Sequence, residues 1–491
     1  MPAKLTVVDG EQDFKDPRTT VFWYRTGKTW KINRERLYAA AKHLGFRLYR
    51  NALCQVIDQF IHEREPRFFF DALKDFIKEM HQEEYEIESI NNAYETFIQK
   101  NGKFSIERIP LILDHEIIKD TKHSCYKFYL DAYVLITAKN ITTHPYDQLP
   151  GLVFASKVQP RIFRAGNKGR YLEFLNLACN LRENMEYISR IVGYYAHEYN
   201  DEGMGYFAVL TESVSDPKLG GGSGKNLFGK LLTLTTSIVD QSGSQTELDD
   251  TIFQIWKGQR IFSISDLPKD FDFIFFKNIS TGGIIHKRLY KDREEVDISL
   301  SPKLIFNTNY SFLCSDGGLR RRIIPLEFTN FFTINGGVEG YFNCWFPTDW
   351  NEDDWAGFDG FVTRGIQTWF RSGCKLEPQK LSEGGWTKQF EYAFGSTIVQ
   401  IIDTFWTEWI SKEAVKNDDF KKQVNDFYND NSIAKSYQPT IKKLHKALEE
   451  YGAHFGTEFK ADVTRREAHL TYKCRTFIKT GNILAEEDNP F

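Results

Sequence analysis

A glycine-rich stretch at residues 220–228, Gly-Gly-Gly-Ser-Gly-Lys-Asn-Leu-Phe, constrains the fold of this chain more than any other feature. An apolar run of strand length precedes it at residues 206–213. Behind it, apolar side chains recur at the spacing of one helix face, at Leu227, Leu231, Leu234 and Ile238. Strand, glycine turn and helix in this order predict a phosphate-binding loop. The glycines let successive backbone N–H groups turn toward the anion, and the helix N-terminus adds partial positive charge.

The residue types of the loop indicate its contacts. The groups expected around the phosphates belong to Gly220, Gly221, Gly222, Ser223, Gly224, Lys225 and Asn226. Lys225 would reach the outer phosphates as a point charge. The match to the phosphate-loop pattern is imperfect, since Leu219 replaces its first glycine and Asn226 replaces the Ser or Thr that holds Mg²⁺. The alternative is a flexible Gly/Ser linker, which rarely lies between a strand and an amphipathic helix.

Composition and charge exclude several classes of protein. The chain has 491 residues, 41% of them hydrophobic and 15% aromatic, which suits about three packed domains and argues against wholesale disorder. The formal net charge is −4, so contact with nucleic acid would need local basic patches. The seven cysteines are scattered without a Cys-x-x-Cys pair, which suggests a reducing compartment and no structural zinc. The sequence shows no signal peptide and no apolar run of membrane-spanning length, so we expect a soluble cytoplasmic protein.

Residues 1–165 predict a mixed α+β module. We expect a hairpin around residues 26–28 and a helix from Leu37 that Gly45 stops. Two further helices and a pair of strands near residues 126–137 should follow. No nucleophile–base pair, metal cluster or carboxylate pair stands out in this part of the sequence, which favours a structural or substrate-gripping role.

A basic segment without acids follows at residues 156–170. Its cations are Lys157, Arg161, Arg164, Lys168 and Arg170. The segment is either a contact with a nucleic-acid backbone, where clustered cations release counterions, or a solvated linker. Helical spacing returns over residues 172–199 and predicts a helical collar that leads into the phosphate-loop strand.

Polar residues end the strands expected downstream of the loop. The strand at residues 260–266 ends in Asp266, and a strand-end carboxylate beside a phosphate loop suits Mg²⁺ and water positioning. The strand at residues 303–309 ends in Asn309. Between them the pattern predicts a hairpin with basic side chains near its tip, namely His286, Lys287, Arg288 and Lys291. An arginine run at 320–322 comes last.

Phosphate loop, strand-end acid, basic hairpin, strand-end asparagine and arginine cluster follow one another in a compact order. This order resembles superfamily 3 helicases, the AAA+-type ring motors of viruses, phages and plasmids. The chain is most similar to the helicase half of phage and mobile-element primase–helicases, over about residues 172–332. No primase motifs are found. The resemblance implies an α/β fold with an AAA+-like P-loop ATPase core and a parallel central sheet.

The resemblance also implies roles for single residues. Lys225 would bind the β- and γ-phosphates of ATP, and Asp266, together with Asn226, would hold Mg²⁺. Asn309 would be the sensor of the attacking water or γ-phosphate, and Arg321 or Arg322 the arginine finger that completes a neighbouring subunit's site. The hairpin cations would line the pore of a homo-oligomeric ring, expected to be a hexamer, and contact single-stranded or forked DNA by its backbone.

Two departures from the family pattern leave an alternative open. Asn226 replaces the Mg²⁺ hydroxyl, and Ser265 stands where a first acid usually precedes Asp266. The primary hypothesis is an ATP-dependent DNA helicase for replication of a phage, plasmid or other mobile element. The alternative is a nucleotide-gated DNA-binding or assembly factor with weak or no ATP hydrolysis. A P-loop small-molecule kinase fits poorly, because it has no use for the basic hairpin or the arginine finger.

The C-terminal third predicts a mainly helical, winged-helix-like domain. Helices are expected over residues 397–410 and 441–451, the second stopped by Gly452, followed by a basic strand at 469–479. The domain would grip duplex DNA or dock on the ring. Five tryptophans are expected to be packing anchors rather than base-stacking platforms, namely Trp345, Trp350, Trp355, Trp369 and Trp386.

The last residues form a separate signal. They resemble the acidic tip of bacterial single-stranded DNA-binding proteins and end in Pro490 and Phe491. The resemblance implies docking on host replication or repair proteins, and the alternative is an ordinary disordered acidic tail. The sequence therefore predicts four parts, at residues 1–165, 166–332, 333–484 and 485–491.

Overall fold

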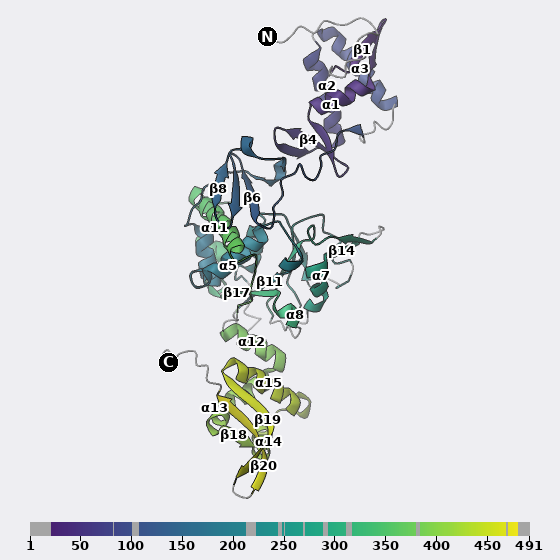
Figure 1. Ribbon diagram of the computed structural model, residues 1–491. Helices are drawn as coiled ribbons and strands as arrows, with labels where there is room; N and C mark the ends of the chain where they lie inside the picture. The colour runs from purple at the N-terminus through teal and green to yellow at the C-terminus, as the bar shows by residue number, and fades with distance from the viewer. Residues whose placement is uncertain are drawn as a thin grey trace. The chain divides into compact units, whose positions relative to one another are not determined.

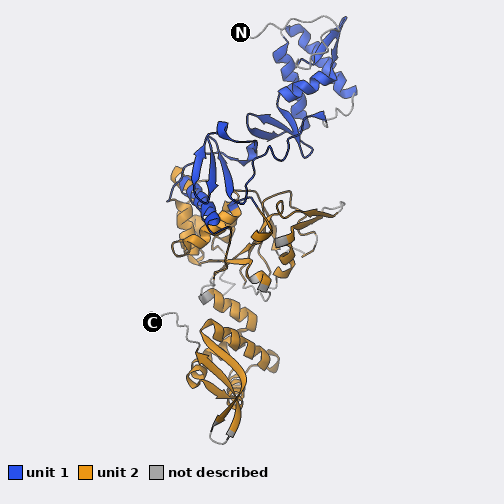
Figure 2. Cartoon of the chain, in the orientation of Figure 1, with its two compact units in different colours: residues 1–167, 196–199, 356–373 blue, residues 168–195, 200–355, 374–491 orange. Residues whose placement is uncertain are grey.

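The computed structural model describes most of the chain. The described ranges are 21–81, 83–100, 108–212, 222–243, 248–249, 251–268, 271–287, 293–310, 317–379, 383–467 and 470–479. The chain divides into two compact units (Figure 2). Unit 1 holds residues 1–167, 196–199 and 356–373, and unit 2 holds residues 168–195, 200–355 and 374–491. The four-part division suggested by the sequence stays a prediction.

Unit 1 is built from small sheets and helices, as expected for an α+β module. Its strands are β1 (Trp23–Thr26), β2 (Thr29–Ile32), β3 (Phe46–Tyr49), β4 (Ala52–Ile57), β5 (Phe60–Glu63), β6 (Ser124–Tyr129), β7 (Tyr133–Thr137), β8 (Ile141–His144), β9 (Val153–Phe154) and β10 (Val158–Gln159). Its helices are α1 (Arg34–His43), α2 (Pro66–Met80), α3 (Glu84–Lys100) and most of α11 (Glu352–Arg371). The strands form sheets in the orders β1-β2, β3-β4-β5-β9 and β10-β6-β7-β8.

The first elements of unit 1 follow the sequence signals closely. β1 pairs with β2 in antiparallel register around Gly27, whose φ is 60°. The α1 helix begins after Asn33, whose side chain accepts a hydrogen bond from the N–H of Arg36. It ends before Gly45, where φ is 79° and an added Cβ would lie 2.2 Å from the carbonyl oxygen of Val56. The predicted hairpin and the helix stop are confirmed.

Unit 2 carries the segment that contains the phosphate-loop pattern (Figure 1). Up to residue 355 its strands are β11 (Phe207–Glu212), β12 (Ile238–Ser242), β13 (Ile261–Ser265), β14 (Ile284–Lys287), β15 (Arg293–Val296), β16 (Lys303–Asn307) and β17 (Ile323–Phe328). Its helices there are α4 (Arg170–Cys179), α5 (Leu181–Ala196), α6 (Lys225–Leu232), α7 (Phe276–Gly282), α8 (Gly317–Arg320), α9 (Phe331–Ile334) and α10 (Gly337–Phe342).

A five-stranded sheet organises unit 2. The strand order is β12-β13-β16-β11-β17, and every neighbouring pair is parallel. All residues of β11 and β16 are buried, and both strands carry apolar runs, at residues 207–210 and 304–306. Phe207, Phe262 and Phe306 belong to the apolar cluster on this sheet. Burying each such ring contributes roughly 1.5–3 kcal/mol.

The expected helical collar consists of α4 and α5, which meet at Asn180 in a left-handed conformation. The hydroxyl of Tyr195 fixes this collar to the sheet. It donates to the carbonyl oxygen of Leu304 at 2.6 Å and accepts from the N–H of Ala208 at 2.8 Å. The two partners lie on β16 and β11, so the collar is tied to the two central strands.

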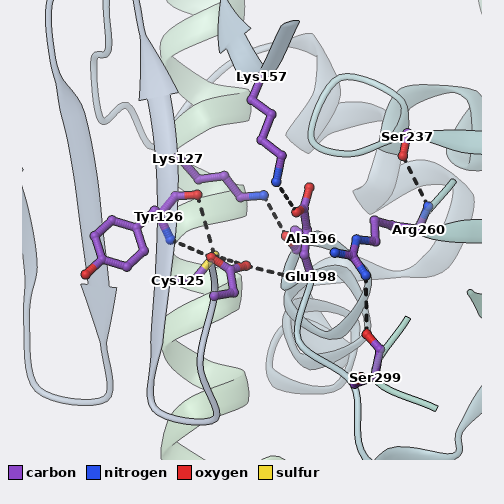
Figure 3. Close-up of polar contacts among 10 residues, drawn as sticks. Cys125, Tyr126, Lys127, Lys157, Ala196, Glu198, Ser237, Arg260 and Ser299 are labelled. Atoms are coloured by element: carbon purple, nitrogen blue, oxygen red, sulfur yellow. Dashed lines mark hydrogen bonds and ion pairs between the residues drawn. The ribbon is translucent and has the colours of Figure 1, made fainter. Parts of the chain in front are cut away.

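A guanidinium fixes the start of β13. Arg260 directs its side chain at the carbonyl of Ser299, with Nη1 3.3 Å from the oxygen, while its N–H lies 3.1 Å from Oγ of Ser237 (Figure 3). These contacts join the segments that lead into β12, β13 and β16. The starts of the three strands are thereby held in a common register.

The C-terminal part of unit 2 has helices and a small antiparallel sheet. Its elements are α12 (Glu383–Phe394), α13 (Ser396–Lys412), β18 (Ala414–Lys416), α14 (Asn417–Asp430), α15 (Ile441–His454), β19 (Thr457–Glu467) and β20 (Leu470–Lys479). The sheet order is β18-β20-β19. The predicted helix stop at Gly452 is wrong, because α15 continues to His454. Gly452 is instead buried where an added Cβ would lie 2.4 Å from the carbonyl oxygen of Thr457.

Tryptophans in the C-terminal third behave differently from one another. Trp350 and Trp369 are buried, which confirms their expected role as packing anchors. Trp386 stacks on the ring of His454 with centroids 3.8 Å apart. Trp345 is 67% exposed, so the expectation is wrong there.

Among the described helices none has both the length and the apolar character that crossing a bilayer requires.

Candidate functional site

The carboxyl ends of parallel strands meet at one edge of a sheet, and ligands of open α/β sheets bind outside that edge. In unit 2 this edge carries Glu212 at the end of β11 and Asp266 directly after β13. It also carries Asn307 at the end of β16, with Asn309 two residues further on. The parallel order therefore gathers polar side chains that are far apart in the sequence.

The glycine turn connects β11 to α6 at the same edge. Gly222 and Gly224 have φ values of 73° and 96°, which other residues rarely adopt. A Cβ on Gly224 would lie 2.6 Å from Cε2 of Phe174, whereas one on Gly222 would meet no atom within 4 Å. The backbone at Gly222 is thus open to close approach, which fits a phosphate group. Gly220 and Gly221 lie outside the described residues.

The helix after the turn is shorter than predicted. It spans Lys225–Leu232, and Ile238 already begins β12. The prediction of one helix through Leu234 and Ile238 is therefore wrong. The apolar residues of α6 and β12 happen to keep a helical spacing across the turn between them, although they belong to two different elements.

Lys225 is the first residue of α6 and lies in a buried polar cluster. Its Nζ donates to Oδ1 of Asn309 at 2.8 Å and forms an ion pair with the carboxylate of Glu212. Ser223 donates its hydroxyl to the same carboxylate at 2.8 Å. The side chains of Lys225 and Glu212 are 6% and 2% exposed. The structure therefore brings together three residues that flank the turn and one from the end of β16.

The electrostatics of this cluster favour a further anion. Burial lowers the pKa of Lys225 below the ordinary lysine value. The carboxylate of Glu212 and, more weakly, that of Asp266 act in the opposite direction without reversing the shift, and the charge of Lys388 adds to it. The ammonium is therefore incompletely compensated, and a phosphate would supply negative charge.

Lys388 on α12 is a second buried cation at the cluster, and sequence reasoning missed it. Its Nζ donates to the carbonyl oxygens of Asn309 at 3.0 Å and Glu212 at 3.4 Å. The separation of Lys388 from Glu212 is 176 residues, so no local pattern connects them. Glu212 was also missed, although its place at the end of the strand before the loop was a usable signal.

The expected metal ligands are only partly arranged for an ion. Asp266 is exposed and has a left-handed φ of 56°, so its carboxylate is accessible at the sheet edge. The amide oxygen of Asn226 accepts a hydrogen bond from Nδ2 of Asn307. Ser265 donates its hydroxyl to Oδ1 of Asp240 at 2.7 Å, so the neighbouring strand β12 brings a carboxylate that the sequence did not indicate. Oxygen donors of this kind fit Mg²⁺, which commonly keeps several waters and one or two carboxylates.

Histidine, cysteine and carboxylate clusters are absent from the described residues. No group of three or more such side chains is placed to hold a metal ion there. The six cysteines whose state is described are free and buried.

The two candidate finger arginines differ in their surroundings. Arg321 is exposed after α8. Arg322 donates from Nη1 to the carbonyl oxygen of Lys277 at 2.9 Å and is half-buried. Arg322 is thus engaged within its own subunit, and Arg321 is the better placed of the two to reach another molecule.

The predicted basic hairpin is present as β14 and β15, which form an arm extending from the sheet (Figure 1). Lys287 is exposed and pairs in register with Arg293, a cation that the sequence-based choice missed. His286 is 2% exposed and packs edge-on against Trp256, with ring centroids 5.4 Å apart. His286 therefore packs inside the fold and is not exposed on the hairpin as expected, while Lys287 beside it is exposed. Arg288 and Lys291 lie outside the described residues.

Several cations of the basic segment at 156–170 are used inside the fold. Lys157 points at the carboxylate of Glu198, as Lys127 points at the carbonyl of Ala196 (Figure 3). Within unit 1, Arg161 forms two hydrogen bonds to the buried carboxylate of Asp359, at 2.6 and 2.8 Å. Lys157 and Arg161 thus pair with carboxylates inside unit 1, whereas Arg164 and Lys168 are exposed, and a nucleic-acid contact of this segment stays a prediction.

Comparison with known proteins gives little beyond this geometry. No family model matches the chain, and no curated protein matches it. Among solved structures, the A form apo structure of the NrS-1 C terminal region aligns with a TM-score of 0.37 and 11% identity, covering 72% of this chain and 96% of that one. A second structure, of the same region with residues 305–718, aligns with a TM-score of 0.32 and 12% identity over the same shares. Likeness at this level carries no argument about the activity of this chain.

Proposed function

We propose that this chain is an ATP-hydrolysing motor that acts on DNA, of the superfamily 3 helicase type that its motifs resemble. The observation that carries the proposal is the contact between Lys225 and Asn309 at 2.8 Å, across 84 residues of sequence. It joins the start of α6 to the end of β16 beside the glycine turn. This meeting of loop lysine and strand-end asparagine is consistent with an AAA+-like P-loop core.

Each polar residue at the sheet edge has a proposed role in this account. Lys225 neutralises the outer phosphates of ATP, and Asn309 orients the attacking water or the γ-phosphate. Asp266, with the amide oxygen of Asn226, would hold Mg²⁺. The ion supplies charge neutralisation on the phosphoryl oxygens when it is bound. The products are ADP and inorganic phosphate.

An arginine from a second copy completes the proposed site. Arg321 is exposed, so its guanidinium can reach a nucleotide held by a neighbouring subunit. Such fingers accelerate phosphoryl transfer by ~10³–10⁵ in general. The proposal therefore includes assembly of several copies into a ring, with six as the number that the family resemblance suggests.

DNA contact is assigned to the β14–β15 arm. Lys287 and Arg293 lie opposite each other on its two strands. Two cations at the end of an arm suit the phosphate backbone of single-stranded DNA, since backbone contact needs charge more than base readout. Glu294 and Glu295 on β15 limit the net charge of the arm, so the expected binding is moderate.

The C-terminal part supports a second DNA contact. Its order of helix, strand, two helices and a hairpin agrees with the winged-helix-like prediction. The hairpin of β19 and β20 carries exposed Arg465, Arg466 and Lys473. Changing both arginines to alanine should weaken binding of duplex DNA, and unchanged duplex affinity at several salt concentrations would exclude this contact.

A nucleotide-gated assembly factor without turnover is the second candidate. It is favoured by the pairing of Asn226 with Asn307 and of Ser265 with Asp240. These contacts occupy oxygens that a metal would use. Asp266 is then the accessible carboxylate among the expected ligands.

The test of the proposed function is ATP hydrolysis by the purified full chain with Mg²⁺, with and without single-stranded DNA. We expect DNA-stimulated turnover that Lys225→Ala abolishes. Lys230→Ala removes an exposed lysine from the same helix and serves as the matched control. Nucleotide binding without turnover would favour the second candidate.

Docking of host proteins stays a prediction from the sequence. Pro490 and Phe491 lie outside the described residues. Deleting Phe491 should abolish binding of the tail to a protein that reads such tips, and an unchanged affinity would contradict the idea.

A further inference from the structure

Two buried ammonium groups meet at the end of β11 and β16, although only one of them belongs to a recognised motif. Lys225 reaches Oδ1 of Asn309 and the carboxylate of Glu212. Lys388, from α12, reaches the main-chain carbonyls of the same two residues. The two amines are thus held by a shared pair of residues beside the glycine turn.

Few negatively charged groups are in direct contact with these amines. Within the described part of the chain, Glu212 is the one carboxylate that either ammonium touches. Lys388 is 7% exposed and contacts carbonyl oxygens, which carry partial charge only. A buried cation without a full counter-charge is costly, and a bound anion relieves that cost.

The donors of Lys388 are also incompletely used. An ammonium has three N–H donors, and the described residues offer Lys388 two acceptors. One of the two contacts, to Glu212, is long at 3.4 Å. Burial lowers the pKa of Lys388, and the charges of Glu212 and Glu327 offset the shift in part. The ammonium of Lys388 can accordingly donate a further hydrogen bond to an oxygen atom.

We propose that Lys388 is a second phosphate-binding residue of the nucleotide site, beside Lys225. The inference rests on the proposed function, because it takes the site beside Lys225 to be the one that binds ATP. A triphosphate carries several negative charges and would be shared by both amines. Glu212 would then keep its hydrogen bond from Ser223, at 2.8 Å.

The arrangement links nucleotide to the C-terminal part of unit 2. α12 leads into α13, which begins the C-terminal helices and hairpin. A phosphate held by Lys388 would therefore fix α12 at the sheet edge. The competing explanation is that Lys388 only tethers α12 to the carbonyls of Glu212 and Asn309, with no contact to nucleotide.

Equilibrium binding of ATP analogue, ADP and AMP to the full chain separates these explanations. For Lys388→Gln, which keeps a hydrogen-bond donor and removes the charge, we expect affinity to fall about 10- to 100-fold for the triphosphate. The loss should be smaller for ADP and near zero for AMP, whereas Lys388→Arg should retain most of the affinity. Lys230→Gln is the control, and thermal unfolding without nucleotide reports whether each variant folds.

An equal loss for all three nucleotides, or no loss, would overturn the inference in favour of a tether. A measurement on the unaltered chain guards against misfolding of the variants. Acetylation of Lys388, followed by mass spectrometry, should be slowed by pyrophosphate but not by adenosine, and equal rates would also overturn it. If the unaltered chain binds no nucleotide, the proposed function itself fails. If Lys225→Ala abolishes binding and Lys388→Gln leaves it unchanged, only the further inference fails.

Discussion

Lys225 and Glu212 form a buried ion pair between the glycine turn and the end of β11. Removing one partner of a buried pair leaves an uncompensated charge, which typically costs about 3–5 kcal/mol. Glu212→Gln should therefore lower the free energy of unfolding of the nucleotide-free chain by about this amount. Glu449→Gln, an exposed change on α15, is the control in denaturant unfolding. Equal stability of the two variants would show that the pair does not stabilise the fold.

The same lysine predicts a pH dependence of stability. The folded-state pKa of Lys225 lies below the ordinary lysine value of 10.5, so the unfolded chain binds more protons as the pH approaches 10.5. Stability contributed through this residue should then rise with pH over that window. Lys225→Met should lack this rise, so the difference in the free energy of unfolding between the unaltered chain and the variant should change with pH. A difference that stays constant from neutral pH to 10 would contradict the assignment.

The two adjacent arginines should separate into activity and stability effects. Arg321→Ala should abolish DNA-stimulated hydrolysis, because the finger acts on the neighbouring subunit's nucleotide, and mixed rings with intact Arg321 should recover part of it. Arg322→Ala should lower the free energy of unfolding by about 1 kcal/mol, since it loses the hydrogen bond to the carbonyl of Lys277. Hydrolysis assays and thermal unfolding check both. If only Arg322→Ala impairs hydrolysis at unchanged stability, the assignment of the finger is reversed.

The hairpin offers a comparison between neighbouring residues. Lys287→Ala should weaken binding of single-stranded DNA and reduce the slope of log affinity against log salt by about one. His286→Ala should leave the slope unchanged and lower stability instead, because the ring packs on Trp256. Affinities measured over a salt series decide between them. An altered slope for His286→Ala alone would place the buried ring in the DNA contact after all.

Much of the framework could be predicted from local sequence signals. The hairpin β1–β2, the stop of α1 at Gly45, the strand before the glycine turn and the β14–β15 hairpin were all indicated by turn residues and apolar spacing. Two other predictions from such signals were wrong. Helical spacing through Ile238 crossed a turn, and Gly452 looked like a stop although close contact with Thr457 requires a glycine inside α15.

The sequence predicted only those site residues that are marked by their own position next to a strand-like run. Lys225, Asp266 and Asn309 each follow or end a strand-like run. Lys388 and Asp240 were missed, because their contacts depend on the strand order and on packing across distant segments. His286 was assigned to DNA from its charge, and its burial became visible only with Trp256 beside it.

Binding of a fluorescent ATP analogue with Mg²⁺ to the full chain tests the central claim most directly. The measurement compares the unaltered chain, Lys225→Ala and Lys230→Ala at equilibrium. The account predicts saturable binding by the unaltered chain and by Lys230→Ala, and its loss in Lys225→Ala. Equal binding by all three proteins, or no binding by the unaltered chain, would contradict it.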